Sequence, residues 1–168
     1  MDSNLSLSVG FKGTVKPKAQ AVPLQEGYLK LGGIVDTTQT TGLKFGVVCS
    51  ADADDPTSIV AGKGSGNVIR GIVVFDDAIA QNSPAHPDSY LPGMPCSFIS
   101  KGLVRFDSWV ATETNQIEPV IGCQVEYNDT TGAVGFVAAG GSADSSNTLL
   151  TGATVVEVSD TGAYIWLA

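Results

Sequence analysis

The fold is decided by one stretch, residues 67–106, which reads NVIRGIVVFDD, then AIAQNSPAHPDSYLPGMP, then CSFISKGLVRF. Its first part is a nearly continuous apolar run from Val68 to Phe75, which is typical of a buried strand and not of an amphipathic helix. Four prolines then fall between residues 84 and 95. They exclude a helix or a central strand, because proline has no N–H to donate. The middle part is therefore predicted to be a displayed loop, from Asp76 to Pro95.

Two details of this stretch lead to further predictions. The third part is expected to turn at Ser100-Lys101-Gly102 and to form a hairpin, and a short helical turn is expected between Asp76 and Gln81. A loop as long as the middle part, without structure of its own, usually has a function. We therefore expect it to contact a partner through His86, Tyr90, Leu91, Pro92 and Met94.

The first 25 residues are predicted to be an extended arm, and residues 26–168 a single β-rich domain. Apolar side chains alternate with small ones near the start of the chain, which is the period of a strand. Pro17 and Pro23 keep the residues before them extended, and lysines follow the alternating segment. The arm is expected to bind a partner through Leu5, Leu7, Val9, Phe11, Lys12, Lys16 and Lys18.

The charge of the chain is low and unevenly placed. Charged residues make up 15% of the sequence, against roughly 25% in an ordinary soluble domain. Such a surface suits a subunit packed against neighbours, or a small extracellular β domain. All nine Lys and Arg residues lie at or before Arg105, whereas residues 106–168 hold eight acids and no base. This asymmetry predicts a basic arm that docks on an acidic surface, its own or a neighbour's. An acidic chain with scattered lysines is not expected to bind nucleic acid.

Motifs for catalysis and for ligand binding are incomplete. His86 is the only histidine, and its neighbours Ser83 and Asp88 cannot easily converge on it within an extended loop. The acidic segment 52–55 lacks the glycine and the distant glutamate of a calcium loop. The glycines of segment 61–66 lack the spacing of a phosphate-binding loop, so this segment is predicted to connect a hairpin. We expect no enzymatic activity and no cofactor.

The cysteines and the hydropathy of the chain indicate where the protein is made and whether it spans a membrane. Cys49, Cys96 and Cys123 each lie in an apolar, strand-like run, so they are predicted to be buried free thiols rather than zinc ligands. The N-terminus has no basic and apolar leader, and no run of about eighteen apolar residues occurs. The chain is therefore expected to be made in a cytoplasm and not to span a membrane.

Two hairpins are predicted after Arg105. Residues 124–127 and 133–137 flank a turn that ends at Gly132, and residues 154–158 and 163–167 flank a similar turn. The Ser, Ala and Gly residues between the hairpins predict a surface loop. With roughly nine to eleven short strands and no long helix, the chain is predicted to be all-β, a single small barrel or sandwich of short antiparallel strands.

Several of these segments resemble the small cement, or decoration, proteins of tailed bacteriophages. The resemblance covers residues 10–137, and its motifs are structural rather than catalytic. They are Gly13-Thr14-Val15-Lys16-Pro17, Glu26-Gly27, the strand Ile69–Phe75, Tyr90-Leu91-Pro92-Gly93 and the run Cys96–Phe106.

The resemblance implies a virion protein that is made in the host bacterial cytoplasm and sits on the outer surface of the capsid. It further implies a homotrimer that clamps adjacent major capsid proteins. Two other classes stay open. One is another β-rich virion component, such as a tail-tube or receptor-binding part. The other is a carbohydrate-binding or hydrolytic β domain, in which Trp109, Trp166, Tyr90 and Tyr164 would stack on sugars.

Overall fold

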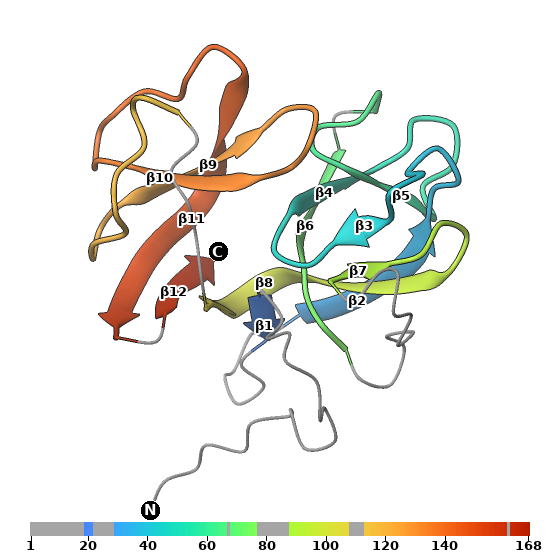
Figure 1. Ribbon diagram of the computed structural model, residues 1–168, viewed down its shortest axis with the longest axis horizontal. Helices are drawn as coiled ribbons and strands as arrows, with labels where there is room; N and C mark the ends of the chain where they lie inside the picture. The colour runs from blue at the N-terminus through green and yellow to red at the C-terminus, as the bar shows by residue number, and fades with distance from the viewer. Residues whose placement is uncertain (1–18, 22–28, 67, 77–87, 108–112, 161) are drawn as a thin grey trace, which may run out of the picture.

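The computed structural model describes residues 19–21, 29–66, 68–76, 88–107, 113–160 and 162–168 (Figure 1). Within these residues the chain forms twelve strands and no helix, which confirms the predicted all-β class. The strands are β1 (Ala19–Ala21), β2 (Leu29–Val35), β3 (Leu43–Lys44), β4 (Val48–Ala51), β5 (Ser58–Ala61), β6 (Val68–Val73), β7 (Ser89–Tyr90), β8 (Pro95–Phe106), β9 (Gln124–Asn128), β10 (Val134–Val137), β11 (Asn147–Ser159) and β12 (Gly162–Leu167).

Five of the strands close into a small barrel. β8 pairs with β2, β2 with β5, β5 with β4, β4 with β6, and β6 returns to β8. All of these pairs are antiparallel except β2 with β5. Closure removes the open edges that a flat sheet of these strands would present. β3 and β7 form a separate two-stranded ladder.

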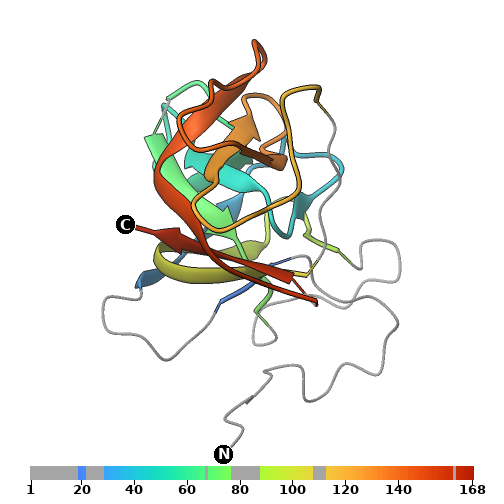
Figure 2. The ribbon, with the colours of Figure 1, turned by 90° about the vertical axis from the view of Figure 1, so that its left-hand side faces the viewer.

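A second sheet shares β8 with the barrel. Its order is β10, β9, β11, β12 and β8, and β1 pairs with the remaining side of β8. The two sheets lie side by side in Figure 1. Figure 2 turns β11 and β12 of the second sheet toward the viewer. The fold is thus a closed barrel extended by a sheet, rather than a barrel or a sandwich alone.

β8 is one continuous strand of twelve residues, so the predicted hairpin at Ser100-Lys101-Gly102 is wrong. Residues 95–101 pair with barrel strands, whereas residues 102–106 pair with β12 and β1. Gly102 has a φ of 121°, a conformation that side chains disfavour but glycine accepts. The glycine therefore marks the point where β8 passes from the barrel into the second sheet, and not a reversal of the chain.

β1 and β2 lie along the same side of β8, opposite β12. Ala21 pairs with Val104 and Leu29 pairs with Lys101, so seven residues separate two strands that are neighbours along β8. β1 falls within the predicted arm, and this part of the arm range is therefore a sheet strand. Residues 1–18 and 22–28 lie outside the described residues.

The apolar run at the end of β6 is continuous because the strand is buried on both of its faces. Val73 packs in the barrel core with Phe98, whereas Ile72 and Val74 pack with Ile99 in a second core between the barrel and the second sheet. A strand covered on both sides has no polar face, so the alternation disappears from its sequence. The predicted strand is confirmed, and its burial is confirmed from Gly71 onward, whereas Val68 is 51% exposed.

Gly71→Ala is expected to destabilise the protein by about 2–3 kcal/mol. Gly71 has a φ of 146°, and a Cβ there would overlap the carbonyl oxygen of Ile99, on the strand that closes the barrel. Urea unfolding would measure the loss. Gly140→Ala is the matched control, because Gly140 has a φ of 76° but no atom within 4 Å of the added Cβ. Equal losses in the two variants would show that the close approach of the strands does not matter.

Both predicted C-terminal hairpins are confirmed, since β9 pairs with β10 and β11 pairs with β12. In the first turn Gly132 has the expected positive φ, 69°. The Asn128 side chain accepts hydrogen bonds from the N–H groups of Thr130 and Thr131, at 3.1 and 2.9 Å. Local turn chemistry of this kind is readable from the sequence.

The predicted hairpin across residues 61–66 is wrong, because β5 and β6 lie on opposite sides of β4. The connection passes across the end of β4, where the Gly62 N–H donates to the Val48 carbonyl at 2.8 Å. Since both strands pair antiparallel with β4, β5 and β6 run in the same direction, and the connection is a crossover rather than a reversal. A glycine-rich segment between two strand-like runs does not show whether the chain reverses or whether the two strands are neighbours.

Candidate functional site

The loop predicted between Asp76 and Pro95 is anchored to the barrel over its last part. β7 pairs with β3, and the Phe45 N–H donates to the Asp88 carbonyl at 2.9 Å. A loop without structure is therefore wrong for residues 88–95, because proline excludes helices and central strands but not short edge pairings. Segment 77–87 lies outside the described residues. It contains Ser83, His86 and most of the expected helical turn. Most of the predicted arm also lies outside the described residues.

Tyr90 is a core residue and not a displayed one. Its side chain is fully buried, its hydroxyl donates to the Val74 carbonyl at 2.8 Å, and its ring packs edge-on against Phe45 with centroids 5.1 Å apart. Burial, and then the nearby Asp76 carboxylate, raise the pKa of the Tyr90 phenol well above its usual value. A partner at the surface would therefore not touch the Tyr90 side chain, so Tyr90 is not part of the proposed contact.

Three other residues of the predicted contact loop surround a fixed turn at the surface. The Val35 N–H donates to the Met94 carbonyl at 2.9 Å, and the Gly93 N–H donates to the Val35 carbonyl at 2.8 Å. Leu91, Pro92 and Met94 are half-buried. The end of β2 thus holds these apolar side chains in one place, where they remain candidates for contact with a partner.

Asp76 fixes the other end of the loop. Its carboxylate forms a salt bridge with Lys30 of β2 and accepts a hydrogen bond from the Ser97 hydroxyl of β8 at 3.0 Å. Two barrel strands therefore hold the residue that precedes segment 77–87. Asp76 on one side of this segment and the turn at residues 91–94 on the other are thus both fixed to the barrel.

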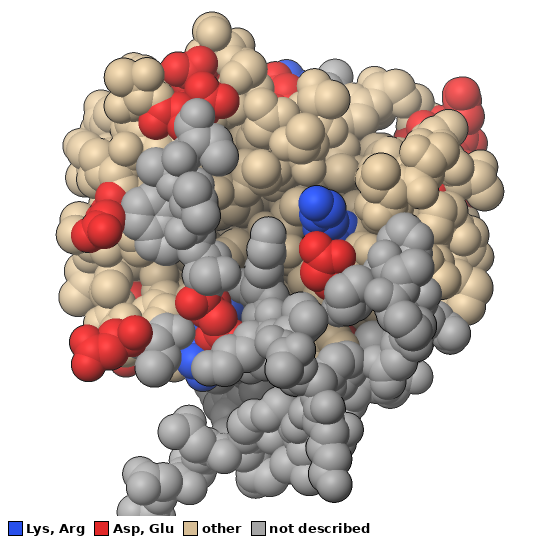
Figure 3. Space-filling model, in the orientation of Figure 1, with Lys and Arg blue, Asp and Glu red and all other residues tan. Residues whose placement is uncertain are grey.

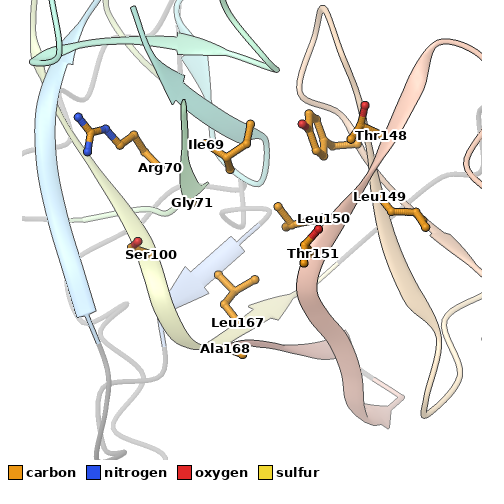
Figure 4. A pocket seen from close by; sticks show the side chains of 11 residues that line it. Ile69, Arg70, Gly71, Ser100, Thr148, Leu149, Leu150, Thr151, Leu167 and Ala168 are labelled. Carbon is orange, nitrogen blue, oxygen red and sulfur yellow. The ribbon is translucent and has the colours of Figure 1, made fainter. Parts of the chain in front are cut away.

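A cleft of about 320 Å³ lies between the barrel and the second sheet (Figure 4). Its lining is mostly aliphatic side chains and hydroxyls, and its one charged side chain, Arg70, donates to the Pro56 carbonyl at 3.3 Å. Such a lining suits contact with polypeptide better than acid–base chemistry. No local sequence pattern marks the cleft, because its walls come from strands far apart in the chain. The residues that line the cleft are Ile69, Arg70, Gly71, Ser100, Tyr127, Thr148, Leu149, Leu150, Thr151, Leu167 and Ala168.

Glu126 of β9 is a fully buried carboxylate held by neutral donors. One oxygen accepts from the side-chain amides of Gln116 and Asn147, at 2.8 and 2.9 Å. The other accepts from the Asn115 side chain at 3.3 Å and the Asp144 N–H at 3.2 Å. The carboxylate therefore ties two surface loops to β9, and its role is structural. Nothing in the sequence distinguishes it from the exposed acids around it.

The acidic segment 52–55 stabilises its own turns. The Asp54 N–H donates to the Asp52 carboxylate at 2.9 Å, and the Thr57 N–H donates to the Asp55 carboxylate at 2.9 Å. The hydrogen bonds from Thr57 lower the pKa of Asp55. Among the described residues, no group of three or more His, Cys, Asp or Glu side chains is placed to hold a metal ion.

The described surface is dominated by uncharged residues. In Figure 3 they cover most of the visible face, and carboxylates are more frequent than Lys and Arg side chains. The low charge that the composition predicted is therefore a property of the folded surface.

No helix in the described part of the chain is long and apolar enough to cross a membrane.

The three cysteines are free and buried, as predicted, and are expected to be unreactive in the folded protein. Burial raises the pKa of Cys49 well above its usual value and that of Cys96 to about 11. Since the thiolate is the nucleophile, iodoacetamide at pH 9 should modify Cys49 and Cys96 only after unfolding. Mass spectrometry of the alkylated protein, with and without denaturant, measures this. Equal rates in the two states would contradict the prediction.

Comparison with known proteins identifies the family. A model of phage cement proteins, described as structural cement protein (E217 gp24/Pam3 gp6), matches residues 3–168. No curated protein matches the chain closely enough to count as a relative. The match spans both sheets and most of the predicted arm, and the family is structural rather than enzymatic. The resemblance read from the sequence is confirmed: this chain belongs to the structural cement proteins of bacteriophages, which are components of the virion capsid.

Proposed function

We propose that this protein binds the outside of the bacteriophage head and stabilises it by bridging adjacent major capsid proteins. Family membership is the observation that carries the proposal. A protein that binds only the assembled shell stabilises it by mass action, because breaking the shell then also requires its release. The largely uncharged surface supports this function, since subunits packed against neighbours tolerate such surfaces.

The bridge is proposed to use two contact regions at opposite ends of β8. Pro95, at one end, follows directly after the turn that presents Leu91, Pro92 and Met94. Phe106, at the other end, pairs with Ala19, where the predicted arm joins the sheet. Eleven steps of about 3.3 Å separate the two ends by up to roughly 35 Å. A single strand, paired on both sides, would thus hold the two regions at a fixed spacing.

Copy number in intact particles tests the proposal. Mass analysis should find this protein and the major capsid protein in near-equal numbers, and sedimentation of the free protein should find a homotrimer. A few copies per particle would instead indicate a tail-tube or receptor-binding part, and would contradict a role in cementing the head.

The loop between Asp76 and Pro95 is expected to become protected when the protein binds heads. Limited proteolysis in this loop should slow by at least about tenfold, because a protease needs access to cleave. The control is a protein without residues 2–18, which should be cleaved at the same rate with and without heads if it no longer binds. Equal cleavage of the free and the head-bound full-length protein would exclude the loop from the contact.

A further inference from the structure

The second sheet carries apolar side chains on the outer face of β8 and β12, whereas its outer face at β9 is covered by the loops that hold Glu126. Its inner face carries Val104, Ile165 and Val155, all fully buried in the second core. The strand register places Leu103 of β8 beside Trp166 of β12, on the opposite, outer face. Tyr164 lies two residues along the same strand and the same face. These three outer side chains are only half-buried.

Exposed aliphatic residues lie on β11 and beside it. Val156 lies in the bulge of β11 and is 43% exposed, while Val120 and Ile121 are 55% and 71% exposed. The turn that carries the last two is fixed to β11, because the Gly122 N–H donates to the Val155 carbonyl at 2.8 Å. Large apolar side chains gathered in this way usually mark a contact surface.

The charges around this face are acidic. Glu157 of β11 lies opposite Tyr164, Asp160 follows the last residue of β11, and Glu118 precedes the turn that carries Val120 and Ile121. All three are exposed. Arg105 of β8 lies opposite Tyr164 on the same face, but its guanidinium is paired with the Asp107 carboxylate at 2.8 Å. Residues 106–168 contain no Lys or Arg. The surface therefore favours a ligand that combines apolar side chains with cations. In this chain, the segment with that composition is residues 1–18, with alternating Leu, Val and Phe followed by three lysines.

The direction of β1 favours a neighbouring molecule as the partner. β1 runs antiparallel to β8 with Ala19 opposite Phe106, so the chain enters β1 at the end of the sheet. To reach its own outer face, the segment would have to reverse within residues 12–18, where Pro17 keeps Lys16 extended. A second copy requires no reversal, and 18 extended residues span up to about 60 Å.

We propose that the outer face of the second sheet, formed by Leu103, Tyr164, Trp166 and Val156 and bordered by Val120 and Ile121, is the docking surface for residues 1–18 of a second copy of this chain. The inference deepens the proposed function and rests on it for the use of the arm as a contact element. Each copy then both donates an arm and accepts one, which links neighbouring cement subunits to one another.

Isotope-resolved cross-linking of the full-length protein tests the proposal without heads. Equal amounts of ¹⁵N-labelled and unlabelled protein are mixed and treated with a carbodiimide, which joins lysine amines to nearby carboxylates. We expect peptides with Lys12, Lys16 or Lys18 of one isotope to be linked to peptides with Glu118, Glu157 or Asp160 of the other. Links within one isotope only would show that the arm folds back on its own sheet. Links that avoid this face would overturn the proposal as well.

A pair of variants provides an independent readout. Val156→Asp should weaken self-association in sedimentation by at least about tenfold, since it places a charge in the apolar contact. Val68→Asp is the matched control, because Val68 is 51% exposed but lies on the barrel strand β6. Equal behaviour of the two variants would overturn the proposal. Because this experiment contains no heads, equal behaviour of the two variants would leave the proposed function unaffected. A protein that self-associates but does not bind heads would contradict the proposed function alone.

Discussion

Deletion of residues 2–18 is expected to abolish decoration of heads while leaving a folded protein. Each of the apolar side chains Leu5, Leu7, Val9 and Phe11 contributes about 1.5–3 kcal/mol when fully buried. The entropy lost when the arm becomes ordered offsets most of this binding free energy. If about 3 kcal/mol remains, its loss on deletion lowers the affinity for heads by roughly 100-fold. The barrel and β1 remain, since β1 begins at Ala19. Sedimentation of heads with labelled protein measures the binding.

The control for this deletion is an arm of the same length and composition whose apolar residues no longer alternate. It should bind as poorly as the deletion if the strand period matters, because consecutive apolar residues point to opposite sides of an extended chain. Both variants should melt within about 2 °C of the full-length protein. A truncated protein that still bound heads with full affinity would show that the arm is not a contact element.

Loss of the Glu126 carboxylate is expected to cause the largest change in stability. Glu126→Gln keeps the shape of the side chain but replaces one acceptor oxygen with a donor, which then faces the donors that surround it. Hydrogen bonds to a buried charge contribute about 1.5–3 kcal/mol, and buried donors left without an acceptor cost a similar amount. We therefore expect a loss of about 3 kcal/mol, or a fall in melting temperature of roughly 6–12 °C.

Glu157→Gln provides the comparison, because Glu157 is exposed on β11 and should change stability by less than about 0.5 kcal/mol. Urea unfolding of both variants gives the two free energies. Hydrogen exchange should further show faster opening of the loops at residues 113–117 and 138–147, whose groups donate to the carboxylate. If the two variants are equally stable, the donors around Glu126 find other acceptors and the network is not a constraint.

The parts of the fold that were predicted correctly depend on local chemistry. The hairpin of β9 and β10 follows from strand-forming runs on either side of a turn that ends at Gly132, where φ is positive. The burial of the second half of β6 follows from the apolar run of residues 72–75 at its end. Each of these inferences uses residues only a few positions apart. The family resemblance likewise depended on motifs that are contiguous in the sequence.

The incorrect predictions concern which segments meet. Gly102 was expected to reverse the chain, but β12 and β1 continue the pairing of β8 beyond it, and the strand stays extended. The glycines of residues 61–66 were expected to join neighbouring strands, but β4 inserts between them. Glycine permits a turn or a bend equally well, and long-range pairing decides between the two.

For this protein, the sequence by itself determined the all-β class, the two C-terminal hairpins, the buried thiols and the family, because period, turn chemistry and contiguous motifs are local properties. Only the tertiary structure decided that β8 belongs to two sheets, that Tyr90 is buried, that Glu126 ties two loops together, and that Leu103, Tyr164 and Trp166 share one outer face. Each of these features joins residues that are distant in the chain. The free energy of such contacts depends on which surfaces the folded chain brings together, and a local pattern does not record that.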